Sequence, residues 1–381
     1  MSIDGWVGAG LYDPESPGAD ERRALLEFLT ARGATVEQMV DAHALGSLPA
    51  VAGDLALGHQ GEMLSVRELA ARGGVSVERA ERVLLAVGLP TAGESRLPSN
   101  LASLFDSFEQ GASLMGEDAI VAFTRVLGAA ATNIAEAATS LFYAELGPGT
   151  PREGSTEVER ARIWETATLA FATVPDVLHQ VLLAQFARAG RRAALARGWS
   201  ATSGAPDDEA GLGQGEVVAL GFVDLVGSTS WAEGLSLRDH SLALSRFESA
   251  AWSAAVQSGG RVIKMIGDEA FFAAPSVDAA CRIGTGVCRS AASDPLLPPA
   301  RAAVGHGLVT PREGDYFGPL VNLVSRLVKV AEPGALVITA EAAAALPSDR
   351  WTLRELDRAP LRGLEHPTRV FAVTIPDPPA N

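Results

Sequence analysis

The pattern of apolar and polar positions divides the chain into two halves with different periods. From residue 19 to about residue 200, apolar side chains recur every three or four positions, which is the spacing of amphipathic helices. We find no convincing strand pattern in this half and predict an all-α domain. Residues 1–18 are rich in glycine and proline and predict a loosely held arm. The predicted helices are Ala19–Ala31, Thr35–Leu45, Ser65–Arg72, Ser76–Val87, Leu101–Leu114, Asp118–Leu146 and Glu157–Arg197.

The period changes after residues 201–215, a polar stretch rich in glycine that predicts a flexible linker. Beyond it, short apolar runs of strand character alternate with helical runs, which predicts an α/β or α+β domain. The predicted domains are therefore 1–200, all helical, and 216–381, mixed. Strands are expected at Val217–Val223, Arg261–Ile266, Glu269–Ala273, Ala302–Leu308, Ala335–Thr339, Trp351–Leu356 and Thr368–Thr374, and helices at Arg238–Gln257, Ser276–Ala292 and Gly318–Val330.

Composition favours a soluble, globular protein without a nucleic-acid partner. The 381 residues suffice for two cores, and 47% hydrophobic with 20% charged residues are ordinary values for globular domains. The net charge is −15, and residues 1–200 hold 16 arginines and no lysine against 25 acidic residues. Nucleic-acid binding needs a basic surface, which this balance disfavours. Leu64–Leu84 has the period of a helix-turn-helix, but in this acidic setting we interpret it as two packed helices, with a DNA-binding regulator as the alternative.

The sequence also predicts a cytoplasmic protein that does not insert into a membrane. Its first residues lack the basic and apolar segments of a signal peptide. The most apolar stretches, 119–146 and 170–187, are interrupted by charged and polar residues, so they predict core helices rather than membrane spans. The two cysteines, Cys281 and Cys288, lie seven apart in one predicted helix, which indicates buried thiols rather than a disulfide.

Two carboxylates stand where predicted strands end. Asp224 follows the apolar run Val217–Val223, and Asp268 lies in a Gly-Asp turn between two predicted strands. Each feature alone is a common turn or helix cap. Together, beside a loop of small residues, they suit divalent cations that hold a triphosphate. The residues of this loop are Leu225, Val226, Gly227, Ser228 and Thr229.

A second group of polar residues stands among apolar neighbours. Lys264, one of only two lysines in the chain, lies inside an apolar strand and would need a polar partner if buried. Asn322 and Arg326 are four apart, so they share one helix face and can reach the same object. Their apolar neighbours favour contact with an anion over a plain solvent face.

Five of these polar residues, together with Asp315, carry a family resemblance, which covers roughly residues 217–375. They occur in the order and with the local spacings of the class III nucleotidyl cyclases, and Pro360–Leu364 resembles the end of that family's domain. The helical half is similar, more weakly and best over Leu64–Pro90, to the regulatory domain that precedes actinobacterial class III adenylyl cyclases. The implied fold is a ferredoxin-like α+β catalytic domain preceded by an all-α regulatory domain. The six residues are Asp224, Lys264, Asp268, Asp315, Asn322 and Arg326.

The resemblance implies an adenylyl cyclase, which converts ATP to 3′,5′-cyclic AMP and pyrophosphate. Asp224 and Asp268 would then hold two Mg²⁺ or Mn²⁺ ions, while Asn322 would orient the ribose and Arg326 would meet charge on the phosphoryl oxygens. Adenine offers an acceptor at N1 and a donor at N6, and guanine the reverse. A lysine donor and an aspartate acceptor, here Lys264 and Asp315, therefore favour ATP.

In the family, one protomer supplies the metal-binding acids and the other supplies the base-reading and transition-state residues. A head-to-tail homodimer is therefore implied, and a lone subunit should be inactive. The connection from Thr310 to Asn322 is short and leaves little of the extended arm that some relatives use for dimer contacts. The helical domain would regulate through the long predicted helix Glu157–Arg197, or act only as a dimerisation scaffold. A small molecule or pH is the expected signal, the latter through His43, His59 and His179.

Two further functions stay open at this point. A catalytically silent, cyclase-like signalling scaffold would be favoured by the loss of any of the six residues, and none is lost. A diguanylate cyclase is disfavoured, because Ile266 stands where its signature has the first glycine.

Overall fold

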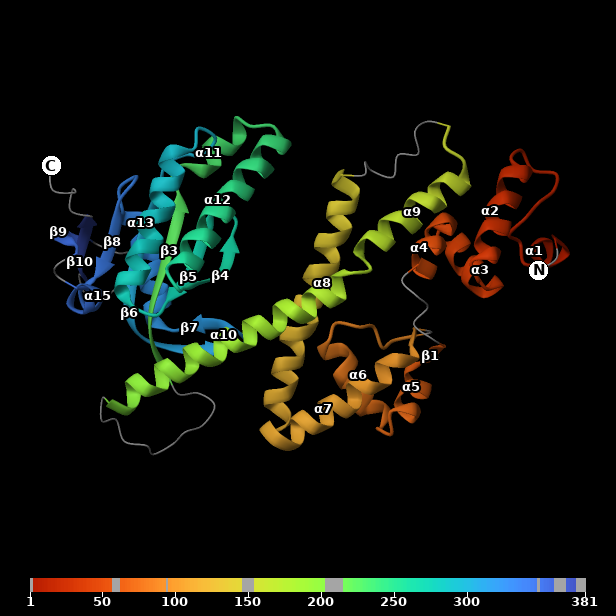
Figure 1. Cartoon of the computed structure of the whole chain (residues 1–381), viewed down its shortest axis with the longest axis horizontal. Coiled ribbons are helices and arrows are strands. Elements are labelled where there is room, and N and C mark those ends of the chain that lie inside the picture. Colours follow the sequence, from red (N-terminus) through yellow and green to blue (C-terminus); the bar gives the residue numbers. More distant parts are fainter. Residues whose placement is uncertain are drawn as a thin grey trace. The chain divides into compact units, whose positions relative to one another are not determined.

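The computed structural model describes residues 3–56, 62–93, 95–145, 154–202, 215–347, 350–359 and 368–374. The chain forms two compact units, Met1–Ala193 and Ala194–Asn381 (Figure 1). Almost all of the predicted linker, the segment 360–364 and His59 lie outside the described residues.

The first unit is built from helices whose starts are fixed by side-chain caps. Thr35, Ser65 and Thr156 each accept a hydrogen bond from the backbone amide three residues on. The Gln or Glu side chain at that position accepts one from the amide of the capping residue. The α-helices are α1 (Ile3–Gly8), α2 (Ala19–Ala31), α3 (Val36–Ala44), α4 (Val51–Ala56), α5 (Val66–Arg72), α6 (Val77–Ala86), α7 (Ala102–Met115), α8 (Glu117–Glu145), α9 (Glu157–Phe171) and α10 (Val174–Thr202). Two 3₁₀ turns, η1 (Leu48–Ala50) and η2 (Ser99–Leu101), complete it.

Two apolar clusters stabilise this unit. One joins α1 to α4 with α9, and the other joins α5 to α8. The loosely held arm predicted for residues 1–18 is wrong, because Trp6 and Leu11 are 3% and 2% exposed in the first cluster. Burial of a tryptophan and a leucine outweighs the mobility that glycine and proline suggest.

The first unit also contains a small two-stranded ribbon. Its strands, β1 (Met63–Ser65) and β2 (Arg96–Pro98), pair antiparallel over three residues each. We found no convincing strand in this half of the sequence, and that prediction is wrong at this point. Three residues are too few to show an alternating pattern, so no local signal predicts these strands.

The helix-turn-helix segment is used for packing. In α6, Arg79 lies over the ring of Phe108 and donates to Glu109 at 2.8 Å, with Glu117 also 2.5 Å away. A guanidinium that is neutralised by two carboxylates of its own domain is poorly placed to meet a phosphate backbone. These contacts support the interpretation as two packed helices.

The long helix predicted over Glu157–Arg197 is two helices, α9 and α10, separated at Ala172 and Thr173. The prediction that the apolar stretch 170–187 lies in a core is wrong. Four large apolar side chains of α10 are at least half exposed: Val177, Val181, Leu183 and Phe186. By length and apolar composition Glu157–Ala194 could also cross a membrane, a weak signal that many helices of soluble proteins share. The structure therefore leaves an apolar surface on α10 without cover from the described residues.

The second unit is an eight-stranded sheet flanked by helices. Six elements form a ferredoxin-like βαββαβ unit. In chain order they are β3 (Glu216–Leu225), α12 (Leu237–Gln257), β4 (Arg261–Ile266), β5 (Glu269–Ala274), α13 (Val277–Ser293) and β6 (Ala300–Arg312). Its strands lie antiparallel in the order β4-β5-β3-β6. The sheet continues through β8 (Leu336–Thr339), β10 (Thr368–Thr374) and β9 (Thr352–Ala359), while β7 (Asp315–Phe317) pairs with the end of β6. The remaining helices are α11 (Ser228–Glu233), α14 (Pro319–Leu327), η3 (Val328–Val330) and α15 (Ala340–Ala345).

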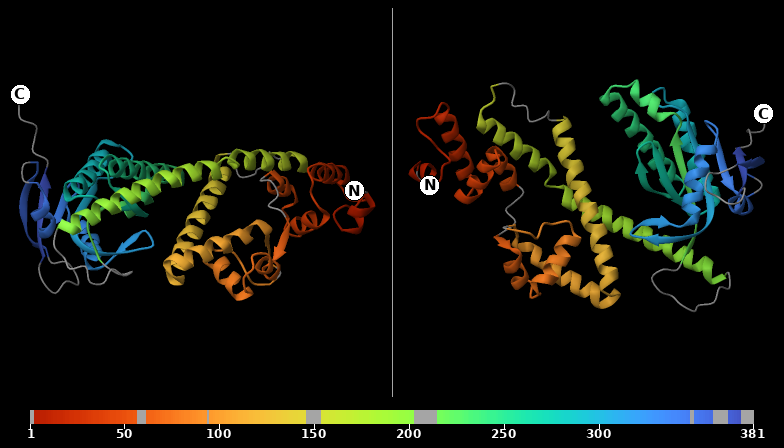
Figure 2. Two further views of the ribbon diagram at one scale, coloured as in Figure 1. Left: turned by 60° about the horizontal axis from the view of Figure 1, so that its bottom comes forward. Right: turned by 180° about the vertical axis from the view of Figure 1, so that it is seen from behind.

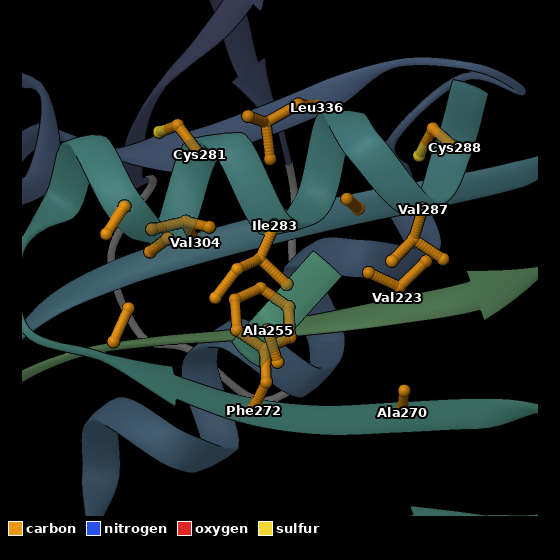
Figure 3. Close-up of a cluster of buried hydrophobic side chains, with 14 of the residues drawn as sticks. Val223, Ala255, Ala270, Phe272, Cys281, Ile283, Val287, Cys288, Val304 and Leu336 are labelled. Carbon is orange, nitrogen blue, oxygen red and sulfur yellow. The ribbon is translucent and has the colours of Figure 1, made fainter. Parts of the chain in front are cut away.

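Alternation along the strands separates two cores. Phe272 points into the core beneath α12 and α13 (Figure 3). Its neighbour Phe271 lies in the core beneath α14. Cys281 and Cys288 lie on α13 in the first of these cores, buried and unbonded, as the sequence predicts. The sheet therefore has helices on both faces, and α12 and α13 run along one of them (Figure 2).

The predicted strands and helices of the second unit are all present, with small shifts at their ends. The sequence missed three elements, the helix α11, the strand β7 and the helix α15, which are six, three and six residues long. The β7 strand makes the connection after Thr310 a short hairpin, which turns at Glu313 and Gly314 with φ of 54° and 81°. The arm that the sequence predicts to be short is thus a two-strand projection.

Candidate active site

A row of three charged residues crosses the sheet at the end of β3. Asp224 is directly opposite Glu269 of β5 on one side and Arg301 of β6 on the other. Directly opposed residues of antiparallel strands point to the same face. The row therefore places a carboxylate pair and a guanidinium on one face of the sheet.

Asp224 is almost fully buried, and both of its oxygens accept hydrogen bonds from cations. Arg301 donates to Oδ2 from Nε at 2.9 Å and from Nη2 at 2.8 Å. Lys329 of η3 donates from Nζ to Asp224 Oδ1 at 2.6 Å and to Glu269 Oε2 at 2.8 Å. Arg301 also donates to the backbone oxygen of Lys329 at 2.9 Å. A buried carboxylate in such a setting keeps its charge because it is paired and hydrogen-bonded.

The cluster shifts the proton affinity of its members. Burial raises the pKa of Glu269, with the nearby charges of Asp224 and Asp268 adding to it, and together they outweigh the opposing effect of Lys329. Burial lowers the pKa of Lys329, but its hydrogen bonds to Asp224 and Glu269 outweigh this, so the net shift is upward. The three carboxylates therefore lie close enough together at one edge of the sheet to affect the ionisation of Glu269.

Asp268 lies in the turn between β4 and β5, as the sequence predicts. Gly267, with φ of 62°, makes the turn possible, and the backbone oxygen of Asp268 accepts from the amide of Leu225 at 3.2 Å. This bond joins the hairpin to the end of β3, next to Asp224. The two predicted metal ligands are thus tied together through the backbone.

The chemistry of these donors fits Mg²⁺ or Mn²⁺, both of which prefer carboxylate oxygens. Within the described part of the chain, no group of three or more His, Cys, Asp or Glu residues converges as a metal cage. Mg²⁺ is commonly held by one or two carboxylates together with water and substrate phosphates. A site built on Asp224 and Asp268 matches that pattern, provided that an oxygen of Asp224 is released by its present partner.

The segment predicted as a small-residue loop is only partly a loop. Gly227, with φ of 68°, caps α11, so Ser228 and Thr229 form the first turn of a short helix. The amide of Val226 donates to the oxygen of Pro299 at 2.8 Å and is therefore used by the fold. Leu225 is buried at the strand end and its amide is bonded to Asp268. The amides of Leu225 and Val226 therefore do not point to a ligand.

Lys264 and Asp315 are brought together across the sheet. Lys264 Nζ donates to Asp315 Oδ2 at 2.5 Å, and Asp315 Oδ1 accepts from the amide of Tyr316 at 2.7 Å. The sequence predicts a polar partner for this lysine if it is buried, and its side chain is 47% exposed. The polar partner that we predicted for it is Asp315.

Asn322 and Arg326 lie on the exposed face of α14, one turn apart. The opposite face of this helix packs Val324 and Leu327 into the second core. The sequence favours contact with an anion over a plain solvent face, and in the single chain both side chains are exposed to solvent. Both side chains stand on a surface that a second molecule can reach.

Sequence reasoning missed three residues of this site: Glu269, Arg301 and Lys329. Lys329 carried a weak signal, because it is the only lysine of the chain besides Lys264. Arg301 and Glu269 could be found only from the register of β3 against its two neighbours, which a single sequence does not show.

Comparison with known proteins gives similarity in both units. Residues 9–189 match the family model described as "Adenylate cyclase regulatory domain". An uncharacterized protein of Mycobacterium tuberculosis H37Rv is 27% identical over 378 residues, which cover 97% of this chain and 94% of that protein. The pH-sensitive adenylate cyclase of M. tuberculosis CDC 1551 is 27% identical over 93% of this chain and 88% of its own length. An adenylate cyclase of Glutamicibacter nicotianae is 36% identical over 146 residues, 38% of this chain and 36% of that protein.

Proposed function

The chain belongs to the class III adenylyl cyclases that carry an N-terminal helical regulatory domain, and we propose that it converts ATP to 3′,5′-cyclic AMP and pyrophosphate at sites shared between two copies of itself. The observation that carries the choice of ATP is the contact between Lys264 and Asp315. It places a hydrogen-bond donor and an acceptor side by side on a partly exposed surface.

This pair matches the edge of adenine. The ammonium of Lys264 can donate to N1, and the free lone pairs of Asp315 can accept from the N6 amino group. Guanine presents a donor at N1 and an acceptor at O6, so each contact would oppose like with like. A site that hydrogen-bonds its substrate rejects analogues strongly, because mismatched polar groups are left unpaired.

Asp224 and Asp268 are the residues that we propose to hold two Mg²⁺ or Mn²⁺ ions. When bound, such ions neutralise the triphosphate and lower the pKa of the ribose 3′-hydroxyl. The protein positions these carboxylates at adjoining strand ends that are joined by the Leu225 to Asp268 backbone bond. Two ordered strands thereby fix the site where the 3′-hydroxyl would attack the α-phosphorus.

Asn322 and Arg326 are proposed to act on the reacting groups. Asn322 would orient the ribose, and Arg326 would donate to the phosphoryl oxygens as negative charge grows on them. Contacts of this kind are typically worth 10²- to 10³-fold in rate. Both residues are exposed on α14, which supports their use on a nucleotide bound at a second protomer's carboxylates.

A homodimer is supported by exposed apolar surface as well as by the divided site. Along α10, Val177, Val181, Leu183 and Phe186 are all exposed, and on α8 Phe123 is also about half exposed. Large apolar side chains on a helix usually mark an interaction surface. We propose that a second copy covers them.

Regulation by the first unit is proposed on the match of residues 9–189 to a cyclase regulatory domain. A hollow of about 590 Å³ in this unit is bordered by Arg22, His43, Glu157 and Arg160. Arg22 donates to both oxygens of Glu157 at 2.7 Å, and its Nη1 lies 3.3 Å from His43 Nδ1. We place the pH or small-molecule signal here. If replacing His43, His59 and His179 together leaves the dependence of activity on pH unchanged, histidine-based pH sensing is excluded.

The direct test is product analysis with purified full-length protein, ATP or GTP, and Mg²⁺ or Mn²⁺. We expect cyclic AMP from ATP, little cyclic GMP from GTP, and loss of product in Asp268→Ala. Glu248→Gln, which changes an exposed acid on α12, is the matched control and should keep its activity. Absence of turnover with either nucleotide and either metal would favour a silent signalling scaffold.

A further inference from the structure

The two cations that bind Asp224 differ in how firmly they are held. Arg301 makes two hydrogen bonds to Asp224 Oδ2 and a third to the backbone oxygen of Lys329, and its side chain is 20% exposed. Lys329 reaches Asp224 with a single ammonium on a flexible stem, and its side chain is 50% exposed. Arg301 is therefore a fixed part of the fold, whereas the Lys329 ammonium can move into solvent by giving up only its bonds to Asp224 and Glu269.

The oxygens of Asp224 are divided between these cations. Arg301 donates to Oδ2, and Lys329 donates to Oδ1. Both lone pairs of Oδ2 are used by Arg301, so a metal ion bound to Asp224 would bind Oδ1, whose single donor can leave. An ammonium 2.6 Å from that oxygen occupies the same space as the ion and carries like charge.

We propose that Lys329 is an internal competitor for the metal site: its ammonium binds Asp224 Oδ1 and Glu269 and must be displaced for a divalent cation to bind Asp224. The proposal rests on the metal role of Asp224 in the proposed function. It adds a residue that sets how much metal the site needs, rather than one that reacts with the nucleotide. Lys329 lies three residues beyond Arg326 on the continuous α14 and η3 segment.

The experiment is a titration of full-length protein with Mn²⁺ in the absence of nucleotide, with free Mn²⁺ measured by electron paramagnetic resonance. Lys329→Met keeps the length and apolar stem of the side chain and removes its charge. Removing a neighbouring positive charge should tighten Mn²⁺ binding by about tenfold or more. Lys329→Arg restores a cation and should return the affinity towards the wild-type value.

Lys264→Met is the matched control, because it removes the other lysine of the chain from a position paired with Asp315 instead. We expect its Mn²⁺ affinity without nucleotide to equal that of the wild type. Circular dichroism verifies that each variant is folded, and Lys329→Gln is the substitute if the methionine variant is not. Equal or weaker Mn²⁺ binding in a folded, uncharged Lys329 variant overturns the proposal.

Two outcomes separate this inference from the proposed function. If the wild type makes cyclic AMP but the Lys329 variants bind Mn²⁺ with unchanged affinity and ATP more weakly, then Lys329 is a nucleotide ligand and the competition is wrong. If the wild type neither binds Mn²⁺ nor makes cyclic AMP, both the metal site and the competition are wrong.

Discussion

At the scale of single residues, the second unit keeps polar groups inside its sheet only where each has a partner or stays neutral. Asp224 is charged and held by two cations, whereas the thiols of Cys281 and Cys288 lie among apolar side chains. The two arrangements follow from the same cost of burying charge. They lead to different predictions for reactivity and for the effect of pH.

The thiols should be unreactive in the folded protein. Burial raises the pKa of Cys281 and Cys288 to about 12, so almost no thiolate is present at pH 8. We predict that a thiol reagent such as dithionitrobenzoate modifies them only as fast as the protein unfolds. The check is the rate of modification in buffer and in denaturant. Labelling of either residue within seconds in the native protein would contradict the prediction.

His306 should make the second unit sensitive to acid. It lies on β6 opposite Ala219, and burial lowers its pKa below the ordinary value. The unfolded chain therefore binds the proton more readily, so stability is full above the ordinary histidine pKa and falls as the pH drops towards the folded one. His306→Gln removes this contribution. Urea unfolding at pH 7.5 and 5.5 should show a larger loss of stability in the wild type than in the variant, and an equal loss would refute the assignment.

At the scale of elements, Arg261 and the Lys264–Asp315 contact both hold the β6–β7 hairpin against β4. Arg261 donates from Nη1 to the oxygen of Gly314 at 3.0 Å, and its guanidinium carbon lies 5.2 Å from the ring centroid of Tyr316. Gly314 and Tyr316 flank Asp315 on both sides. Arg261 is therefore a positioning residue for the proposed adenine-reading pair.

We predict that Arg261→Ala reduces the preference for ATP. A misplaced Asp315 loses its contact with N6, so the ratio of kcat/KM for ATP over GTP should fall by about tenfold. Steady-state kinetics with both nucleotides check this, and Arg261→Lys, which keeps the charge but not the fork of donors, should lie between. An equal fall for ATP and GTP would mean that Arg261 only stabilises the fold.

The packing of β3 gives a second prediction at this scale. An added Cβ at Gly221 would lie 2.3 Å from Cζ of Phe272 and 2.7 Å from the oxygen of Ala303, so alanine cannot fit without moving the sheet. Gly221→Ala should destabilise the unit by about 2–3 kcal/mol or more. Gly286→Ala on α13 is the matched change, since its Cβ would meet Ala254 at 3.6 Å, and should stabilise by about 0.5–1 kcal/mol. Denaturation midpoints that move in the same direction would contradict this account.

The elements that the sequence predicted well are those with many turns or strong alternation. The helix Ala19–Ala31 was predicted to the residue, and the strands around the Gly267 turn were found because apolar runs surround a turn dipeptide. The strands β1, β2 and β7 were not predicted, because three residues are too few to show a period. The apparent arm at Trp6 was wrong because burial depends on distant partners that a local pattern does not show.

Prediction of the site had a similar limit. Asp224 and Asp268 were found from their places at strand ends, and Lys264 from its place in an apolar strand. The contact of Lys264 with Asp315 joins positions 51 residues apart, and the contacts of Lys329 with Asp224 and Glu269 span longer separations still. Those contacts depend on strand register and on the path of η3, so no local motif reveals them.

At the scale of the whole molecule, the proposed catalysis requires two copies of the chain for each active site. Asn322 and Arg326 stand exposed on α14, whereas Asp224 is buried at the end of β3. The apolar surface of α10 is the region where we expect contact between copies. Each chain would then give its carboxylates to one site and its α14 residues to the other.

Complementation between inactive chains tests this arrangement most directly. Asp268→Ala and Asn322→Ala should each abolish cyclic AMP formation in a homodimer. Mixing them in equal amounts under conditions of subunit exchange should restore about a quarter of the wild-type rate, because half of the dimers are mixed and each has one intact site. A mixture that stays inactive, although light scattering shows dimers and labelled subunits exchange, would contradict the shared site.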